Sequence, residues 1–332
     1  MNWSKGFTAE YYAYYIDPVT WRETEQIDII SGSISRSMNG LRDACDLKIS
    51  GQVEGERWIR IYLDARQQGA SAHIPLFTGL TSQPEREIEG SIEENTLQCF
   101  SVLKPCQDIL LDRGYYVPAE ITGDIILKDL LSVTPAEVVI TGEMPSLRKA
   151  IIAEDGETHL TMADKVLSAL NWRMRLQGDG TIELAPMPID EIAEFNPLDN
   201  DIVEPSLEIS YDWYQCPNVF RAVQGNQSAI AKDENPNSPL SVVNRGREVW
   251  KEDTNANLNN LESIGEYAIR RLKEEQRVSL KASYTRRFNP DILVGDLIVS
   301  RYNQLEGMFR ILSQSIDIEY GAATEEQVEA YE

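Results

Sequence analysis

Apolar and polar positions alternate over much of the first hundred residues. Short alternating segments stand between turn-forming or charged stretches, a pattern typical of β-strands. The segment 84–94 alternates charge with apolarity, as a solvent-exposed strand or hairpin would. Strands at this spacing predict a sandwich or barrel. The remaining predicted strands are 27–37, 46–51, 58–66, 73–82 and 95–103.

The pattern changes at Pro105. Leucine and isoleucine recur at helical spacing in 104–116 and 123–133. The stretch 186–205 is rich in proline and acidic residues, and it predicts a linker or a long loop.

The clearest local signal lies between 159 and 186. Thr161 is predicted to cap a helix that includes Asp164 and ends at Asn171. Two strands should then flank the Gly-Asp-Gly at 178–180 as a hairpin. A calcium loop is the alternative, but no spaced run of acids completes one.

Strand patterns return after residue 205, interrupted by a polar, turn-rich excursion at 232–250 that should lie exposed. Thr254 is predicted to open a helix that covers one flank of a sheet. Its apolar stripe, which favours packing over a cofactor site, consists of Leu261, Ile264, Ala268 and Leu272.

The segment 289–318 predicts a closing hairpin. Gly295 suits the turn that introduces its first strand, DLIVSR, and Gly307 punctuates the gap before the second, MFRILSQSIDI. Both glycines are expected to serve backbone geometry. The side chains expected to be buried are Leu297, Val299, Phe309 and Leu312.

The sequence therefore divides into a β region at 1–103, a mixed helix-and-hairpin region at 104–205 and a second β region at 206–332. The fold class predicted is α+β and rich in β-structure.

The composition narrows the range of functions. A formal net charge of −23 over 332 residues repels phosphate backbones and disfavours tight nucleic-acid binding. Solubility explains such acidity, and so does a surface that nucleic acid must pass without sticking. No apolar run approaches the ~20 residues of a membrane span. The N-terminal stretch lacks the apolar core of a secretion signal, so the chain is expected to be made and kept in a cytoplasm unless something carries it out.

Cysteine and histidine offer little chemistry. The four cysteines have no metal-ligand spacing and are expected to be buried, reduced thiols. The two histidines, His73 and His159, lie in unrelated contexts, which counts against a histidine-dependent triad. The cysteines are Cys45, Cys99, Cys106 and Cys216.

Sequence motifs for phosphate loops, nucleophile elbows, zinc proteases and dinucleotide binding are missing. We therefore predict no catalytic, cofactor-binding or metal residue and no cofactor. Acid pairs at 93–94 and 233–234 leave a carboxylate-dependent glycosidase as the alternative, with little specificity. An N-terminal aromatic cluster is a candidate for binding sugar or stacking on bases, although such residues more often pack on a neighbouring strand or partner chain. It consists of Tyr11, Tyr12, Tyr14 and Tyr15.

Several stretches in order resemble the XkdQ/YqbQ-like hub proteins of phage tails and phage-tail-like particles. They begin with YYIDPVTWRE and IDIISGSISRS, and continue through LFTGLTSQPEREIEGSIEENTLQCFSVLKPCQDILLDRGYY and IIAEDGETHLTMADKVLSALNWRMRLQGDGTIELAP. They end with NPNSPLSVVNRGREVW, the following helix and the hairpin after NPDILVGD. The resemblance covers nearly the whole chain. One departure is Cys106, where an aliphatic residue is expected.

The resemblance implies a non-enzymatic baseplate hub with two tail-tube-like β domains flanking the mixed one. Three copies would give six tube-like domains in a ring, between a sixfold tail tube and a threefold central spike. The implied partners are the tail-tube or tube-initiator protein and the spike, with tape-measure and baseplate wedge proteins as further candidates. The implied location is the tail of the particle, assembled in the host cytoplasm, with a lumen that lets DNA pass.

Overall fold

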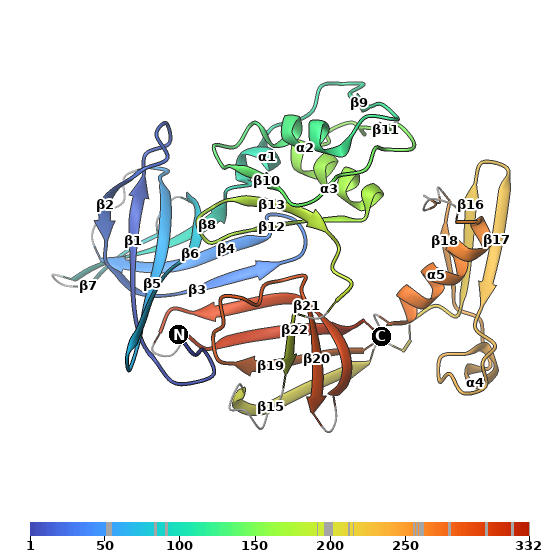
Figure 1. The fold of residues 1–332 in the computed structure, drawn as a ribbon. Helices are drawn as coiled ribbons and strands as arrows, with labels where there is room; N and C mark the ends of the chain where they lie inside the picture. Colours follow the sequence, from blue (N-terminus) through green and yellow to red (C-terminus); the bar gives the residue numbers. More distant parts are fainter. Residues whose placement is uncertain are drawn as a thin grey trace.

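The computed structural model describes most of the chain (Figure 1). Some described residues are placed by their backbone alone, namely 85–89, 92–94, 194–195, 202–206, 277 and 302. The described residues are 1–50, 55–82, 85–89, 92–190, 192–195, 202–211, 213–214, 216–254, 256, 258, 262–277, 280–302, 305–319 and 322–331.

The first region is built from strands, as its alternation predicts, and it also contains one that the pattern missed, β1. The strand predicted near residue 85 forms β7, which pairs with β8. The strands are β1 (Thr8–Ile16), β2 (Glu23–Ile27), β3 (Ile29–Ser37), β4 (Asp43–Ser50), β5 (Trp58–Gln67), β6 (Ala70–Thr81), β7 (Glu85–Glu89) and β8 (Ile92–Ser101).

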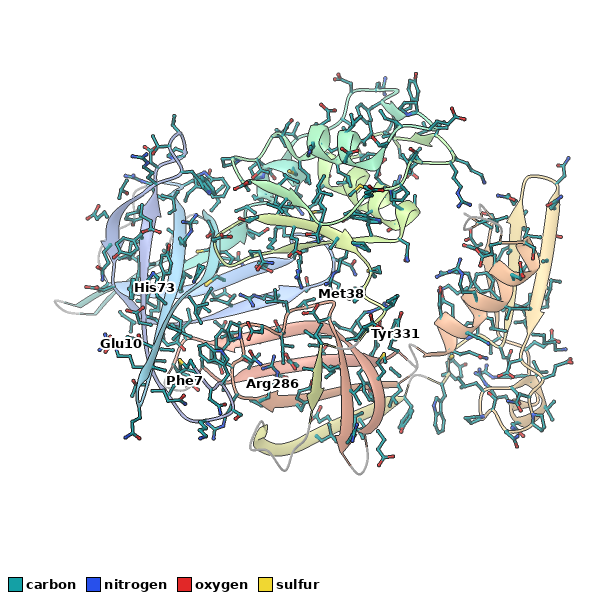
Figure 2. The ribbon with its side chains drawn as sticks, viewed as in Figure 1. Phe7, Glu10, Met38, His73, Arg286 and Tyr331 are labelled. Atoms are coloured by element: carbon teal, nitrogen blue, oxygen red, sulfur yellow. The ribbon has the colours of Figure 1, made fainter. Side chains whose placement is uncertain are left out.

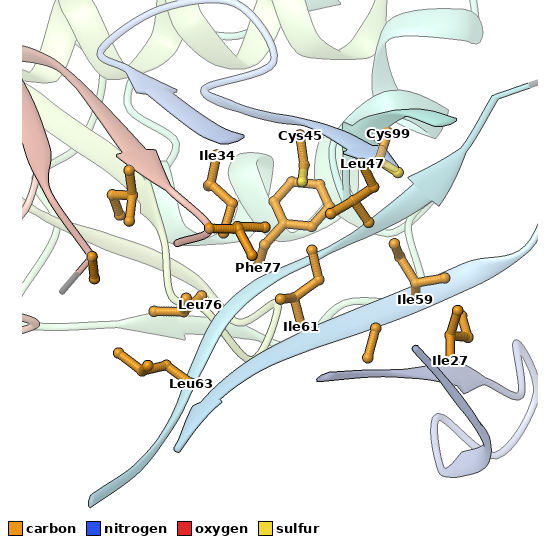
Figure 3. Packing of buried hydrophobic residues seen from close by; sticks show 14 of the residues in the cluster. Ile27, Ile34, Cys45, Leu47, Ile59, Ile61, Leu63, Leu76, Phe77 and Cys99 are labelled. Carbon is orange, nitrogen blue, oxygen red and sulfur yellow. The ribbon is translucent and has the colours of Figure 1, made fainter. Parts of the chain in front are cut away.

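This sheet folds over on itself at a corner between β6 and β8. These strands share only three residue pairs, from Gly79↔Ser101 to Thr81↔Cys99. A Cβ at Gly79 would lie 2.2 Å from the carbonyl oxygen of Phe100. Only glycine permits so close a backbone approach. The two halves then enclose one apolar core, around Phe77 (Figure 3).

The mixed region packs its helices against a small sheet. Thr158, and not Thr161, is the N-cap of α3, and the two threonines form a reciprocal capping box. The prediction of the start was wrong by three residues because both threonines satisfy the same sequence pattern. The helix ends at Asn171 in a left-handed conformation, as predicted, and the hairpin around 178–180 is confirmed. The elements are α1 (Lys104–Asp108), β9 (Tyr116–Val117), α2 (Gly123–Leu131), β10 (Val138–Ile140), β11 (Ile151–Ile152), α3 (His159–Leu170), β12 (Trp172–Leu176) and β13 (Ile182–Pro186).

The second β region contains the closing hairpin, but the hairpin is not the last element. Gly307 lies inside β21 opposite Ser300, not in the turn, whose residues 303–304 fall outside the described ones. A further strand, β22, follows and pairs with both β19 and β21. The strands are β14 (Ala193–Phe195), β15 (Ile202–Tyr211), β19 (Leu280–Arg286), β20 (Leu297–Tyr302), β21 (Leu305–Asp317) and β22 (Thr324–Ala330). The paired strands described here do not close into a barrel.

A small unit is inserted between β15 and β19 and stands apart from the rest (Figure 1). It has its own core, centred on Phe220 and Leu272. The excursion at 232–250 runs through it. Its helix α5 begins at Ile264 and covers this small sheet, so the predicted start at Thr254 was wrong; Leu261 lies outside the described residues. The elements are β16 (Val219–Gln224), β17 (Gln227–Lys232), α4 (Val242–Arg245), β18 (Trp250–Asp253) and α5 (Ile264–Arg277).

Among the described residues, no helix is long and apolar enough to cross a membrane.

Candidate functional site

The two β regions meet edge to edge, through strands that are far apart in the sequence. Strand β21 pairs with β3 in an antiparallel register that runs from Ser313↔Ser37 to Asp317↔Ser33. The result is one sheet, with strands in the order β15-β19-β22-β21-β3-β4-β8-β6-β5-β1-β2. Because backbone hydrogen bonds cross this junction, one chain presents two β regions in a fixed relation.

The core also continues beneath the junction. Ile34 and Ile316 are direct cross-strand partners and are 0% and 1% exposed. Phe288, from the second region, packs in the same cluster as the first region's core. Burial of each such side chain contributes about 1.5–3 kcal/mol. The junction is therefore stabilised by apolar packing on one face of the sheet as well as by the backbone hydrogen bonds between β3 and β21.

Ion pairs fasten the mixed region to both β regions. Arg42, on the first region, lies 2.5 Å from Asp164 of α3 and donates from Nε to the carbonyl oxygen of Met174 at 2.9 Å. Asp296, on the second region, accepts hydrogen bonds from Arg173 at 2.8 Å and Arg175 at 3.2 Å. The three regions are therefore held together by charge-assisted hydrogen bonds.

A further acid near this joint is buried. Asp43 is 6% exposed, and its nearest cation, Arg36, lies 4.0 Å away. Burial raises the pKa of Asp43 to about 6, because the attraction of Arg36 and Arg42 does not fully offset the lost hydration.

The second β region encloses a polar network around Glu326, which is 1% exposed. Its carboxylate accepts hydrogen bonds from Arg286 at 2.6 Å, Tyr284 at 2.9 Å and Gln314 at 2.6 Å. Burial, and then the neighbouring carboxylate, raise the pKa of Tyr284 well above its ordinary value. Figure 2 labels Arg286 on the strand that crosses this region.

The two histidines are not brought together. His73 lies on β6, where its ring stacks on Tyr62 at 4.4 Å and its Nδ1 lies 2.7 Å from Asp64 (Figure 2). His159 lies at the start of α3, with its Nδ1 3.0 Å from the carbonyl oxygen of Leu130. Each histidine has local partners, and no triad is assembled.

The N-terminal tyrosines divide between the two faces of β1. Tyr11 and Tyr15 pack against the first core, and Tyr11 donates to the carbonyl oxygen of Glu319 in the second region at 2.9 Å. Tyr12 and Tyr14 lie on the other face. Burial, followed by a hydrogen bond to Asp64, raises the pKa of Tyr12 to about 12.

The other candidates have structural roles or fall outside the described side chains. Asp233 accepts hydrogen bonds from Ser238 and Gln276, and the side chains of 93–94 are not described. All four cysteines are buried, as predicted. Within the described residues, no group of three or more histidine, cysteine, aspartate or glutamate side chains is placed to hold a metal.

Two strands lie at opposite ends of the joined sheet. Within the described chain, β15 pairs only with β19 and β2 only with β1. Each leaves one row of backbone donors and acceptors open to another strand, which is the usual template for strand addition.

Comparison with solved structures identifies the architecture. A tail protein of Neisseria meningitidis MC58 superposes with a TM-score of 0.71 at 15% identity, covering 97% of this chain and 96% of that one. The 43 kDa tail protein of prophage MuSo2 from Shewanella oneidensis gives 0.67 at 14%, covering 97% and 98%. The fold is that of phage tail proteins.

A component of a bacterial secretion system has a similar fold. An E. coli component of the type VI secretion system, itself described as similar to T4 tail proteins gp27 and gp5, gives a TM-score of 0.51 at 9% identity, covering 92% of this chain and 74% of that one. No family model matches the sequence. No curated protein matches it either.

Sequence reasoning missed the junction and the network around Glu326. Buried and exposed positions alternate in β22 (TEEQVEA), which is the signal of a strand. The signal is hard to recognise because the segment is rich in acidic residues. The pairing of β21 with β3 has no local signal.

Proposed function

We propose that this chain is the structural hub of a phage or phage-tail-like baseplate. Three copies would form a ring that joins the sixfold tail tube to the threefold central spike and forms part of the tail channel. The observation that carries the proposal is the β3–β21 pairing, since it sets two β regions side by side in one chain. Three such chains offer six units to a sixfold tube.

The open edges support a ring. With β15 at one end of the sheet and β2 at the other, head-to-tail addition of identical chains extends the sheet from copy to copy. A heterologous contact of this kind closes into a ring when its rotation allows. The further partners proposed are the tube or tube-initiator protein, the spike, and the tape-measure and wedge proteins, all within the tail of the particle.

Mass photometry of the full-length protein tests the ring. A species of three times the chain mass of 37.6 kDa is expected, alone or with a spike or tube protein. A stable monomer that binds no tail component would overturn the proposal. A reconstruction of the particle should show threefold symmetry at this level.

The hub is proposed to be non-enzymatic. A zymogram on purified peptidoglycan should show no clearing by the pure protein. Clearing that is lost when one carboxylate is replaced would instead establish the glycosidase alternative.

A further inference from the structure

One broad face of the joined sheet has an unusual composition. Among the side chains opposite the apolar core are three consecutive cross-strand rows on β19, β22, β21, β3, β4 and β8, of which the second row spans all six strands. The first row is Ser283, Gln327, Ser313 and Ser37. The second row is Thr285, Glu325, Ser315, Ser35, Ala44 and Phe100. The third row is Asp317, Ser33, Asp46 and Gln98. We call these rows the hydroxyl face.

The hydroxyl face carries acids but no cation. Its charged residues are Glu325, Asp317 and Asp46, and its other members are hydroxyls, amides, one alanine and one phenylalanine. Solvated sheet faces ordinarily carry long side chains of both signs, and 26% of this chain is charged. Lys281, Arg310 and Lys48 stand in the rows beside these on the same face, and Arg310 lies 3.8 Å from Glu329. The ammonium of Lys104 lies over the ring of Phe100, 5.4 Å from its centroid.

The face is also hollowed. A depression of 370 Å³ lies over the β3–β21 junction, bordered by Ser35, Ser315 and Glu325 among others. Two arginines, Arg36 and Arg42, reach its border but are each 7% exposed. Their guanidinium groups are already bound, to the carbonyl oxygen of Leu76 and to Asp164.

The exposed outer face of β1, β5 and β6 is different. Its cross-strand rows carry Arg60 and Arg66 together with the rings of Tyr12, Tyr62 and His73. Cations and aromatic rings are the groups that hold nucleic acid, the first by phosphate attraction and the second by stacking. Among the described side chains, the three rows of the hydroxyl face contribute no cation of their own, and the cations on the same face of the sheet stand in the adjoining rows.

We infer that the hydroxyl face is turned to the channel and forms a wall past which double-stranded DNA slides without adhering. The inference rests on the proposed ring and adds which strands line it. Hydroxyl and amide groups stay hydrated and exert no net pull on phosphates, and three carboxylates repel them weakly. The short side chains of the three rows leave the passage wide.

Thiol accessibility tests the orientation. Ser35→Cys and Ser315→Cys place single reactive thiols on the face, while the native cysteines are buried. Ser228→Cys, on the exposed hairpin of the inserted unit, is the matched control. Mass photometry first establishes whether the ring is present, so a missing ring counts against the proposed function and is not confused with the orientation.

In the ring, a small maleimide should label all three variants. A maleimide carried on a bulky dextran should label Ser228→Cys but react at least tenfold more slowly with the two face variants. Equal labelling by the dextran reagent would place the face outside and overturn the inference. Protection from both reagents would bury the face between subunits and overturn it equally.

Adding positive charge to the hydroxyl face tests whether double-stranded DNA passes along it. Ser35→Arg/Ser315→Arg adds two arginines at directly opposed positions. The wild-type ring should not retain a fluorescent 30-base-pair duplex, whereas the double variant should bind it with a log–log salt slope of roughly −5, as six added phosphate contacts predict. Gln227→Arg/Ser228→Arg, with the same added charge outside, should bind at least tenfold more weakly.

Equal binding by these two double variants would overturn the assignment. So would a wild-type ring that retains the duplex at low salt. A face variant that retains poly-L-glutamate but not the duplex would reassign the passage to an extended polypeptide.

Discussion

At the scale of single residues, buried charged side chains have hydrogen-bond partners on strands that are distant in the sequence. Glu326 shows this most clearly, because its three hydrogen-bond donors come from β19 and β21. A carboxylate that is 1% exposed is tolerated only when such partners replace its hydration.

Replacing Glu326 should therefore be costly. Glu326→Ala leaves the guanidinium of Arg286 buried without its carboxylate, which should lower the free energy of unfolding by about 3–5 kcal/mol. Its neighbour Glu325 is exposed, so Glu325→Ala should change stability by no more than ~0.5 kcal/mol. Urea denaturation of the two variants measures both. Equal stabilities would show that the buried network contributes nothing.

Asp43 should make stability depend on pH in the opposite sense to an ordinary paired acid. Its folded pKa of about 6 exceeds its ordinary value, so the folded state holds the proton more tightly. The stabilisation is full below about pH 4 and is lost as pH rises through 6, amounting to ~2–3 kcal/mol. Asp43→Asn should flatten this part of the stability profile. The exposed Asp46→Asn should retain the wild-type profile, and a wild-type profile in Asp43→Asn would refute the assignment.

At the scale of elements, hairpins and helices are held by backbone contacts as much as by side chains. The β12–β13 hairpin rests on β6, where Thr78 donates to the carbonyl oxygen of Gly178 at 2.8 Å. A Cβ at Gly178 would lie 1.8 Å from the carbonyl oxygen of Pro75. The mixed region can sit so close to the first sheet only because this residue is glycine.

Gly178→Ala should accordingly push the hairpin off the sheet. We expect a fall in melting temperature of several degrees and faster hydrogen exchange in β12, since backbone must move to admit the methyl group. Gly265→Ala is the control, because that helical glycine has open space and alanine favours helix. If both variants melt alike, the close approach is not a constraint.

The closing hairpin is anchored by apolar residues. Leu297 and Phe309 are buried as predicted, whereas Val299 and Leu312 are only half-buried. Phe309→Asp should prevent folding or assembly, because it sets an unpaired carboxylate in the core. Gel filtration and circular dichroism would reveal the loss. Normal assembly of this variant would contradict the prediction.

How far the sequence predicts these elements depends on how local their signals are. Alternation of polar and apolar residues locates the strands of the first region, and Asn171 marks the end of α3. The buried side of β22 escapes prediction because Glu326 looks like a solvated acid until Arg286 is known to face it. The start of α3 is missed because Thr158 and Thr161 are equally good caps. Neither the β3–β21 pairing nor the hydroxyl face can be predicted, since both depend on register between distant strands.

At the scale of the whole molecule, a shared sheet and ion pairs join the three main regions, while the inserted unit at 216–277 stands apart (Figure 1). The three regions are held by the shared sheet and by Asp296, which is 2% exposed and binds two arginines of the mixed region. Among the described residues, the inserted unit meets the mixed region through polar contacts such as the hydrogen bond that Arg148 donates to the carbonyl oxygen of Leu258 at 2.7 Å. The three main regions should therefore unfold as a unit.

The Asp296→Asn variant tests whether the three main regions unfold together. Loss of the charge leaves Arg173 and Arg175 partly buried without their shared carboxylate, which should lower stability by about 2–4 kcal/mol. The mixed region should then melt before the sheet, giving two calorimetric transitions. Asp291→Asn, exposed on the same loop, should keep the wild-type trace. A single unshifted transition in Asp296→Asn would show that the ion pairs do not couple the regions.

The pairing of β3 with β21 also determines when the chain can finish folding during its synthesis. During synthesis β3 emerges early, and its partner is made only after the mixed region and the inserted unit have left the ribosome. Contacts between such distant segments close late and slow the folding of a chain. In the meantime one edge of β3 stands open beside an apolar core, which is a hazard for aggregation. Early local folding of the mixed region and the inserted unit would shorten the effective loop that β21 must close. The complete fold should therefore appear in a final, concerted step, and a chain truncated before residue 305 should misfold and not yield a stable first β region.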